Sequence, residues 1–252
     1  MKLRCNKIIV TGGASGIGLA IAKRVMEEEG VQVVLAGRYM DRLEAAKNEI
    51  GKPGVHCLVW DVSDVSVCKA RIEEAAAMMG GVNGLVNAAG LGTNQLTGRG
   101  YEPWDITEDE WEQLIGTNLT GPYFLMRDMV NHMTEHGEKG NILNIASNAA
   151  CMDVVGAYGS SKSALIRLTR ALGKRYGERG IIINGIAPGA TLTRMISYYA
   201  TSIDQPYPRH AIGRFIRVEE MAELAYYLMS DYGEIICGHT VVADGGDKNA
   251  TL

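Results

Sequence analysis

Short β-branched runs alternate with longer stretches of helical periodicity along the whole 252-residue chain. This alternation is typical of βαβ units, whose parallel strands form one sheet with helices on both faces. It predicts an α/β fold built on a doubly wound parallel sheet. The strands are expected at Lys7–Thr11, Val31–Ala36, Val55–Trp60, Gly84–Asn87, Asn141–Ala146, Ile181–Ile186 and Thr240–Ala243. The helices are expected at Gly16–Glu29, Asp41–Ile50, Val65–Met79, Glu108–His136, Ala157–Glu178 and Val218–Ser230.

No linker, internal repeat or low-complexity segment interrupts this alternation, so we expect residues 1–252 to form a single domain. Two long irregular segments, at about 91–105 and 190–214, each follow the C-terminal end of an expected strand. Open α/β sheets bind their ligands at that edge, so we interpret both segments as walls of a substrate pocket. The first segment contains three large side chains, Arg99, Tyr101 and Trp104.

Charge and hydropathy exclude several kinds of partner. The chain has 25 Lys and Arg against 29 Asp and Glu, a formal net charge of −4, so no basic excess indicates nucleic-acid binding. The apolar part of Met1 to Val10 is too short for a signal peptide, and no apolar run approaches the roughly 18 residues of a membrane span. We therefore expect a cytoplasmic protein with a small-molecule substrate and no membrane partner.

The first expected strand leads directly into a glycine-rich turn and then into an amphipathic helix. The turn reads Thr11-Gly12-Gly13-Ala14-Ser15-Gly16-Ile17-Gly18. Glycines at such a turn let backbone N–H groups approach a pyrophosphate at the positive end of the helix, so the turn predicts a dinucleotide site. A tight structural turn is the alternative. No Lys-Ser/Thr pair follows the glycines, which argues against a nucleoside-triphosphate loop.

Arg38 lies twenty residues after Gly18, at the end of the second expected strand. An acidic residue there would bind the ribose 2′-hydroxyl of NAD, whereas an arginine pairs with the 2′-phosphate of NADP. We therefore predict NADP as the cofactor. NAD is the second choice, because Ser15 and not a second basic residue stands in the glycine turn. A solvated arginine at a strand end is the alternative interpretation of Arg38.

Tyr158 and Lys162 are four residues apart at the start of an expected helix, so their side chains share one face. An ammonium group beside a phenol favours the phenolate and lowers a pKa that is normally about 10. We predict that Tyr158 exchanges a proton with an oxygen whose carbon receives hydride. Ser147, eleven residues earlier, ends a strand where its hydroxyl could hold the same oxygen. Asn118 lies inside a long expected helix, either as a satisfied core amide or in a proton relay.

Several motifs occur in one order along the chain: Thr11–Gly18, Asn87-Ala-Ala-Gly90, Asn118, Ser147, Tyr158, Lys162, Pro188-Gly189 and Asp244-Gly245-Gly246. In this order they resemble the short-chain dehydrogenase/reductase (SDR) family over essentially the whole chain. The resemblance implies a Rossmann-type fold that binds NAD(P) and a catalytic tetrad of Asn118, Ser147, Tyr158 and Lys162. In such a tetrad the tyrosine is the acid/base and the serine positions the carbonyl. The lysine binds the nicotinamide ribose and lowers the tyrosine pKa, and the asparagine holds a water.

The same resemblance implies which residues contact the cofactor. Asp61 is expected to meet the adenine, Asn87 the adenosine ribose and Thr193 the carboxamide. The full set of expected contacts is Gly12, Ser15, Gly16, Ile17, Gly18, Arg38, Asp61, Val62, Asn87, Ala88, Gly90, Tyr158, Lys162, Pro188, Gly189, Thr191 and Thr193. The family also implies a homo-oligomer, a dimer or a tetramer, formed through the expected helices 108–136 and 157–178.

The irregular segments indicate the class of substrate. Met195, Tyr198 and Tyr199 in the second segment suit a bulky, ring-bearing ketone or alcohol such as a hydroxysteroid, although the same side chains also suit core packing. A sugar or polyol dehydrogenase is one alternative. A 3-oxoacyl-carrier-protein reductase is another, in which a basic stripe would dock an acidic carrier. The stripe consists of Arg167, Arg170 and Lys174, and a solvated or subunit-contacting face is the favoured interpretation of it.

Two remote alternatives belong to other functional classes. A dinucleotide sensor would keep the fold without turnover, but such a protein is expected to lose Tyr158 or Lys162, and this chain has both. A zinc peptidase is suggested by His132-Met-Thr-Glu-His136, an H-x-x-E-H pattern. That pattern ends an expected helix, where cationic side chains favour the helix dipole, so we expect no metal site.

Overall fold

The computed structural model describes residues 1–98, 105–152 and 156–250. These residues form a seven-stranded sheet in the order β3-β2-β1-β4-β5-β6-β7, with every neighbouring pair parallel. The strand order runs outwards from β1 in both directions, so the sheet is doubly wound. The predicted fold class is confirmed. The strands are β1 (Lys7–Thr11), β2 (Gln32–Gly37), β3 (Val55–Val59), β4 (Gly84–Asn87), β5 (Gly140–Ile145), β6 (Ile181–Pro188) and β7 (Thr240–Ala243).

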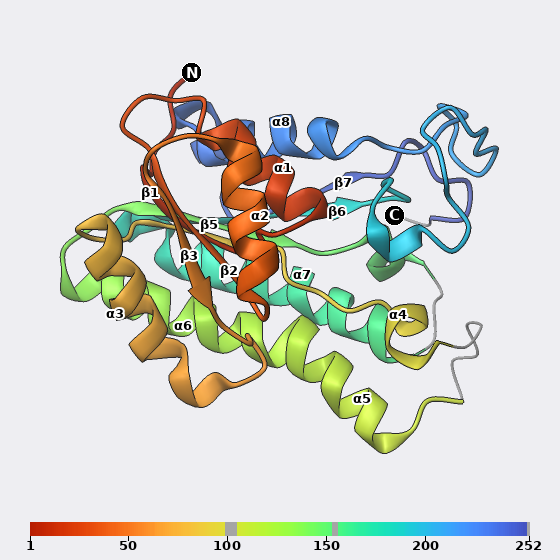
Figure 1. The fold of residues 1–252 in the computed structure, drawn as a ribbon, viewed down its shortest axis with the longest axis horizontal. Coiled ribbons are helices and arrows are strands. Elements are labelled where there is room, and N and C mark those ends of the chain that lie inside the picture. Colours follow the sequence, from red (N-terminus) through yellow and green to blue (C-terminus); the bar gives the residue numbers. More distant parts are fainter. Residues whose placement is uncertain (99–104, 153–155, 251–252) are drawn as a thin grey trace.

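Helices cover both faces of the sheet (Figure 1). One face carries α1 (Gly16–Val25), α2 (Met40–Ile50) and α8 (Val218–Met229), and the other carries α3 (Cys68–Met79), α6 (Gly121–Glu135) and α7 (Ala157–Tyr176). Two further helices are α4 (Thr93–Thr97) and α5 (Glu108–Ile115). A parallel sheet covered on both faces needs strands that are apolar throughout. Accordingly, Ile8, Ile9 and Val10 of β1 are all fully buried.

The predicted helix 108–136 is interrupted. It consists of α5 and α6 joined by a π-helical turn at Gly116–Thr120, in which the Gly121 N–H donates to the Gly116 carbonyl. Pro122 has no N–H, so the carbonyl of Asn118 lacks its usual partner four residues further along. A Cβ atom on Gly121 would lie 2.3 Å from the Val62 carbonyl oxygen, so the turn packs directly against backbone.

Other helix ends differ by a few residues from the predictions. α1 ends at Val25 and not at Glu29, and the chain then turns through Gly30 at φ +80°. α3 begins after a 3₁₀ turn at Val65–Val67, and the short helix α4 was not predicted. Further 3₁₀ turns lie at Asn148–Cys151, Gly177–Arg179, Arg194–Ile196 and Asp231–Ile236. The predicted wall residues Arg99, Tyr101 and Trp104 lie outside the described residues.

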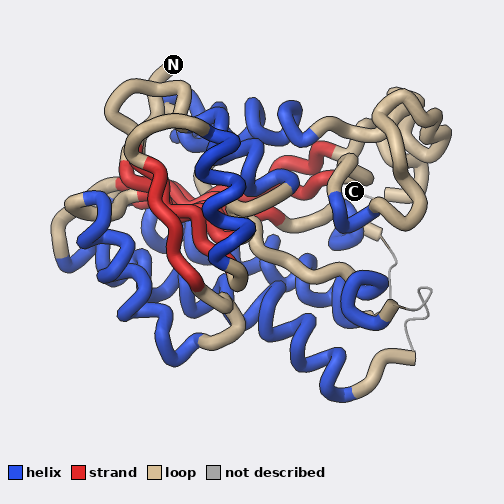
Figure 2. Tube along the Cα trace, in the orientation of Figure 1, coloured by secondary structure: helices blue, strands red, loops and turns tan. Residues whose placement is uncertain are grey.

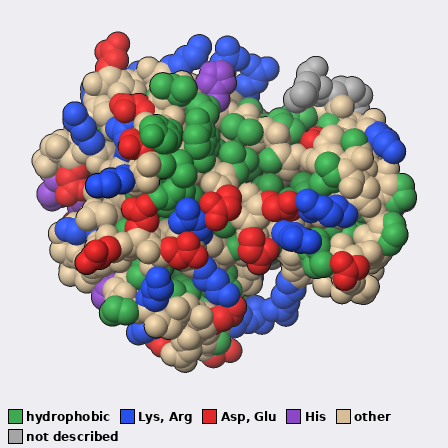
Figure 3. Space-filling view, turned by 90° about the horizontal axis from the view of Figure 1, so that it is seen from above, with side chains coloured by type: hydrophobic (Ala, Val, Ile, Leu, Met, Phe, Trp, Pro, Cys, Tyr) green, Lys and Arg blue, Asp and Glu red, His purple; other side chains and the backbone are tan. Residues whose placement is uncertain are grey.

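The irregular segment 190–217 gathers beyond the C-terminal ends of β6 and β7, as Figure 2 shows. This is the sheet edge at which the sequence predicts the ligand pocket. On the face drawn in Figure 3, acidic and basic side chains are interspersed around apolar ones. None of the described helices is both long enough and apolar enough to cross a bilayer.

Candidate active site

The glycine-rich turn between β1 and α1 forms one end of a cavity of about 800 Å³. Gly12 has φ +65°, and a Cβ atom there would lie 2.8 Å from the Ala89 nitrogen. A Cβ atom on Gly18 would lie 2.5 Å from the Gly12 carbonyl oxygen, so only glycine fits at either position. Ser15 precedes α1 without capping it through its side chain, which leaves the N–H groups of the first turn for an anion such as a pyrophosphate. The turn therefore fits a dinucleotide.

The end of β2 contributes two cations to the cavity lining, Arg38 directly after the strand and Arg42 in the first turn of α2. Their guanidinium carbons lie 5.5 and 4.7 Å from the centre of the Tyr39 ring, within cation–π range. Arg42 was not among the predicted site residues. The signal for it was its position one turn into the helix that starts beside Arg38.

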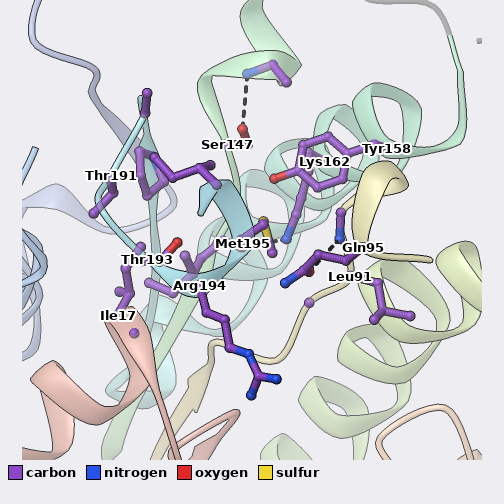
Figure 4. Close-up of a pocket in the computed structure, with 18 of the residues that line it drawn as sticks. Ile17, Leu91, Gln95, Ser147, Tyr158, Lys162, Thr191, Thr193, Arg194 and Met195 are labelled. Atoms are coloured by element: carbon purple, nitrogen blue, oxygen red, sulfur yellow. Dashed lines mark hydrogen bonds between the residues drawn. The ribbon is translucent and has the colours of Figure 1, made fainter. Parts of the chain in front are cut away.

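Tyr158 and Lys162 lie in the first two turns of α7, and Ser147 follows β5 (Figure 4). The hydroxyl groups of Tyr158 and Ser147 interact, and Ser147 Oγ also accepts the N–H of Ala149 at 3.2 Å. Lys162 Nζ donates to the Ile145 carbonyl oxygen at 2.9 Å and lies 5.9 Å from the centre of the Tyr158 ring. The structure thus brings all three predicted side chains to one cavity.

Burial controls the ionisation of these two groups. It raises the pKa of Tyr158, against a smaller opposite effect of the Ser147 hydroxyl. It lowers the pKa of Lys162 to about 8. The predicted lowering of the tyrosine pKa by the lysine is therefore wrong for this structure, because the phenol is withdrawn from water and the ammonium faces the Ile145 carbonyl. At neutral pH, Tyr158 holds a proton that it can donate.

Asn118 is buried behind the cavity wall. Its Oδ1 accepts the N–H of Leu91 at 2.8 Å, and its Nδ2 donates to the Leu91 carbonyl at 2.9 Å. Both ends of the amide are therefore used to hold the backbone after β4. A Cβ atom on Gly90 would lie 3.4 Å from Asn118 Oδ1 and 3.6 Å from Lys162 Nζ, so these two side chains flank the same point.

Most predicted site residues line the cavity. They are Gly12, Ser15, Gly16, Ile17, Gly18, Arg38, Ala88, Gly90, Ser147, Tyr158, Lys162, Pro188, Gly189, Thr191 and Thr193. Asp61, Val62, Asn87 and Asn118 are not part of this lining. Asn87 Nδ2 instead donates to Asn144 Oδ1 at 2.8 Å, and Asp61 accepts hydrogen bonds from Ser63.

The segment after β6 supplies the second wall, which is rich in aromatic side chains. Tyr198, Tyr199 and Tyr207 line the cavity together with Met195. The rings of Tyr198 and Tyr199 are 4.6 Å apart edge to face, and Tyr207 stacks on buried Phe215 at 4.4 Å. Figure 4 shows Met195 and Thr193 on this wall, across from Tyr158. The predicted residues of segment 190–214 are thus joined by Tyr207 and Arg209, which the sequence did not single out.

Comparison with known proteins places this geometry in a family. A family model for short chain dehydrogenases matches residues 6–203. The chain belongs to the short-chain dehydrogenase family. It is 32% identical over 246 residues to a 2,5-dichloro-2,5-cyclohexadiene-1,4-diol dehydrogenase of Sphingobium indicum, with 95% of each chain covered. It is also 32% identical to an acetoacetyl-CoA reductase of Rhizobium meliloti, covering 94% of this chain and 96% of that one. A solved actinorhodin polyketide ketoreductase with NADPH superposes with a TM-score of 0.84 at 28% identity, covering 98% of both chains.

This SDR protein is accordingly an NAD(P)-dependent oxidoreductase that acts on CH–OH groups. The histidines of the H-x-x-E-H pattern have local partners. His132 is buried and its Nδ1 contacts Glu73 Oε1 at 2.9 Å, while His136 Nδ1 contacts the His132 carbonyl and the two rings stack at 4.2 Å. Across residues 1–98, 105–152 and 156–250, no three metal-binding side chains converge. The contact of His132 with Glu73 therefore joins α6 to α3.

Proposed function

We propose that this SDR enzyme uses NADP(H) to interconvert a ketone and a secondary alcohol, with Tyr158 as the acid/base. The observation that carries the proposal is the contact between the Tyr158 and Ser147 hydroxyls inside the cavity that begins at the glycine turn. The residues that would hold the dinucleotide are the glycine turn, Thr191 and Thr193. The bound nicotinamide supplies or accepts the hydride.

Each residue of the tetrad has a separate role in this proposal. Ser147 donates a hydrogen bond to the substrate oxygen and holds it beside the phenol, and Tyr158 transfers its proton to that oxygen during reduction. Lys162 carries its charge below pH 8 and would contact the ribose and return a proton to Tyr158. Asn118 fixes the backbone at Leu91, and its carbonyl, which lacks the usual helical donor because of Pro122, would hold the water of the relay.

Arg38 and Arg42 support NADP over NAD. Both line the cavity at the end of β2, where the ribose 2′-position of a dinucleotide falls when its pyrophosphate lies on the glycine turn. Two guanidinium groups can share the charge of a 2′-phosphate. Arg42 takes the place of the basic residue that Ser15 does not provide.

We propose a bulky, ring-bearing substrate, such as a hydroxysteroid or a cyclic diol. The tyrosine-rich wall of Tyr198, Tyr199 and Tyr207 supports it, since amphipathic rings bind flat apolar rings and hydroxyl groups alike. The similarity to an enzyme named for a cyclohexadiene diol points in the same direction. A 3-oxoacyl thioester is the second candidate, which the similarity to an acetoacetyl-CoA reductase favours.

Absorbance of the reduced cofactor tests the proposal. The purified enzyme would be assayed with a ketosteroid, a cyclic diol, a sugar alcohol and acetoacetyl-CoA, each with both cofactors. We expect turnover of a ring-bearing compound, a lower KM for NADPH than for NADH, and a loss of about 10²- to 10⁴-fold in kcat for Tyr158→Phe with unchanged cofactor affinity. Tyr176→Phe, on the same helix outside the cavity lining, is the matched control. A clear preference for NADH, or full activity of Tyr158→Phe, would contradict the proposal.

We also propose that residues 1–252 form one cytoplasmic domain that assembles into a dimer or tetramer. Trp111 of α5 and Tyr123 of α6 support this assembly, because both are exposed apolar side chains on the predicted subunit-contacting helix. Sedimentation velocity would show a single species of twice or four times the chain mass. A monomer at micromolar concentration would contradict it.

A further inference from the structure

The segment Gly245–Asn249, after β7, runs antiparallel to residues 209–212 of the substrate wall. Three backbone hydrogen bonds join them: Ala211 N to the Gly246 carbonyl at 2.9 Å, Ile212 N to the Gly245 carbonyl at 3.1 Å, and Lys248 N to the Arg209 carbonyl at 3.1 Å. The wall is therefore tied to the end of the sheet through its main chain.

Asp247 adds a side-chain link between the turn that follows β5 and the substrate wall. Its side chain is 2% exposed, and its Oδ1 accepts the Arg209 Nε–H at 2.9 Å and the Asn249 N–H at 3.0 Å. Its Oδ2 accepts a hydrogen bond from Asn148 Nδ2 at 3.0 Å. Burial alone would raise the pKa of this carboxyl, but the Arg209 and backbone donors hold it below its usual value. A buried carboxylate with a cation and two further donors is a well-satisfied arrangement.

Asp247 has two side-chain partners, Asn148 beside the catalytic serine and Arg209 in the tyrosine wall. Asn148 directly follows Ser147, whose Oγ accepts a hydrogen bond from the Ala149 N–H. Arg209 belongs to the tyrosine wall: it interacts with the Tyr207 hydroxyl, and its second guanidinium nitrogen lies 3.0 Å from Met152 Sδ. The guanidinium therefore contacts three protein side chains, those of Asp247, Tyr207 and Met152. Asn148, Arg209 and Asp247 all line the same cavity as Tyr158.

We propose that Asp247 is a positioning residue that fixes the tyrosine wall relative to Ser147 and thereby sets the size of ketone that the enzyme accepts. This inference rests on the proposed role of Ser147. Without the carboxylate, Asn148 and Arg209 lose their common partner, and the wall keeps its backbone hydrogen bonds to residues 245–248 but loses its side-chain link to the turn that contains Ser147. A large ketone contacts both sides and depends on their spacing, whereas a small ketone contacts mainly Ser147 and Tyr158.

Kinetics of Asp247→Asn, Arg209→Gln and the double variant test the consequence. In each single variant we expect kcat/KM for the ring-bearing ketone to fall about ten- to a hundredfold, with a smaller loss for a small ketone such as butanone and unchanged NADPH affinity. The kcat/KM of the double variant should not fall below that of the less active single variant, because both substitutions break the same contact between Arg209 and Asp247. Asp204→Asn, an exposed position of the same wall outside the cavity lining, is the matched control and should behave as wild type. Equal losses for both ketones, or multiplied losses in the double variant, would overturn the proposal.

Hydrogen–deuterium exchange tests the link without any substrate. Asp247→Asn should increase exchange both in residues 207–214 and in residues 147–152, and Asp204→Asn should not increase it in 147–152. Unchanged exchange at 147–152 in Asp247→Asn would overturn the link even if the enzyme is active. Wild-type protein that is inert toward every ketone would overturn the proposed function and leave this exchange result interpretable.

Discussion

The two sides of the cavity are built in different ways. On the cofactor side, the turn after β1 is shaped by backbone contacts, because Gly12 and Gly18 leave no room for a Cβ atom. On the substrate side, segment 190–217 is held by backbone hydrogen bonds to residues 245–248 and also by side chains, such as Arg209 and the Tyr207 ring that stacks on Phe215. A backbone contact admits one residue type, whereas a side-chain contact can be met by several combinations. The glycine turn should therefore tolerate fewer substitutions than the substrate wall, and we expect substrate specificity to be set by the wall.

Gly12→Ala tests the backbone-built side and should have the largest effect. The new Cβ would lie within 2.9 Å of three backbone atoms of Ala88 and Ala89, at a φ of +65° that alanine rarely adopts. We expect the free energy of unfolding to fall by about 3 kcal/mol or more, with loss of measurable NADPH binding. Urea unfolding and cofactor fluorescence would measure the two effects.

Gly30→Ala is the control for that variant. Gly30 also has a left-handed φ, +80°, but nothing lies within 4 Å of its Cβ position. It should therefore cost only about 1 kcal/mol and leave cofactor binding intact. Equal losses of stability and of NADPH binding in the two variants would show that the positive φ, and not the close approach to Ala88 and Ala89, makes glycine necessary at position 12.

Ser147→Ala tests the substrate side. Removing the hydroxyl leaves the substrate oxygen without a donor beside Tyr158, so we expect kcat/KM to fall about a hundredfold, equivalent to ~2.7 kcal/mol. Cofactor affinity should not change, since Ser147 is not among the residues expected to hold the dinucleotide. Steady-state kinetics and a binding titration measure both. Ser160→Ala, an exposed position on α7, serves as the comparison. A parallel loss of cofactor affinity would show that Ser147 also contributes to the cofactor side of the cavity.

Arg42→Gln tests a side-chain contact on the cofactor side. We expect the KM for NADPH to rise about tenfold, because one charge-assisted bond to the 2′-phosphate is lost, with little change for NADH. Arg71→Gln is the control: Arg71 is paired with Glu74 on α3 and lies outside the cavity lining. An equal rise for both cofactors would show that Arg42 shapes the site without contacting a 2′-phosphate.

Glu220→Gln should have the smallest effect, at the junction of the wall with α8. Glu220 binds Arg214 through two hydrogen bonds, at 2.8 and 2.6 Å, and this contact lowers its pKa to about 2. A lowered carboxyl pKa stabilises the fold above pH ~4.5, and the stabilisation disappears as the pH falls towards 2. Both side chains are more than a third exposed, so we expect a loss below about 1 kcal/mol at pH 7 that shrinks at pH 3.

Chemical unfolding at the two pH values would measure this difference. Glu219→Gln is the matched control, because Glu219 lies in the same helical turn, is exposed and has no ion pair with Arg214. A Glu220→Gln effect that is equal at both pH values would show that the charge of the pair contributes nothing.

The sequence predicted the elements whose formation depends on local pattern. The bounds of β1, β4 and β7 agree residue for residue, because each is a short run with apolar β-formers bounded by turn or loop residues. The interruption of helix 108–136 was missed, although Pro122 was visible, since the π-helical turn also depends on the close approach of Gly121 to the Val62 carbonyl from another element.

The candidate site divides along the same line. The glycine turn that lines the cavity could be predicted because its spacing, together with its place between a strand and a helix, specifies the backbone path. Asp247 was not found, because its role arises from contacts with Asn148 and Arg209, which lie 99 and 38 positions away in the sequence. The predicted direction of the shift in the Tyr158 pKa was also wrong, since the spacing places Lys162 on the same helix face but does not report how deeply the phenol is buried.

The crowding around Gly12 also bears on the speed of nucleotide exchange. The N–H groups at the start of α1 are held in place by the fold itself, before any nucleotide arrives. Association at this end should therefore proceed without rearrangement and at similar rates for NADPH and NADH. The difference in affinity between NADPH and NADH should therefore appear in their dissociation rates.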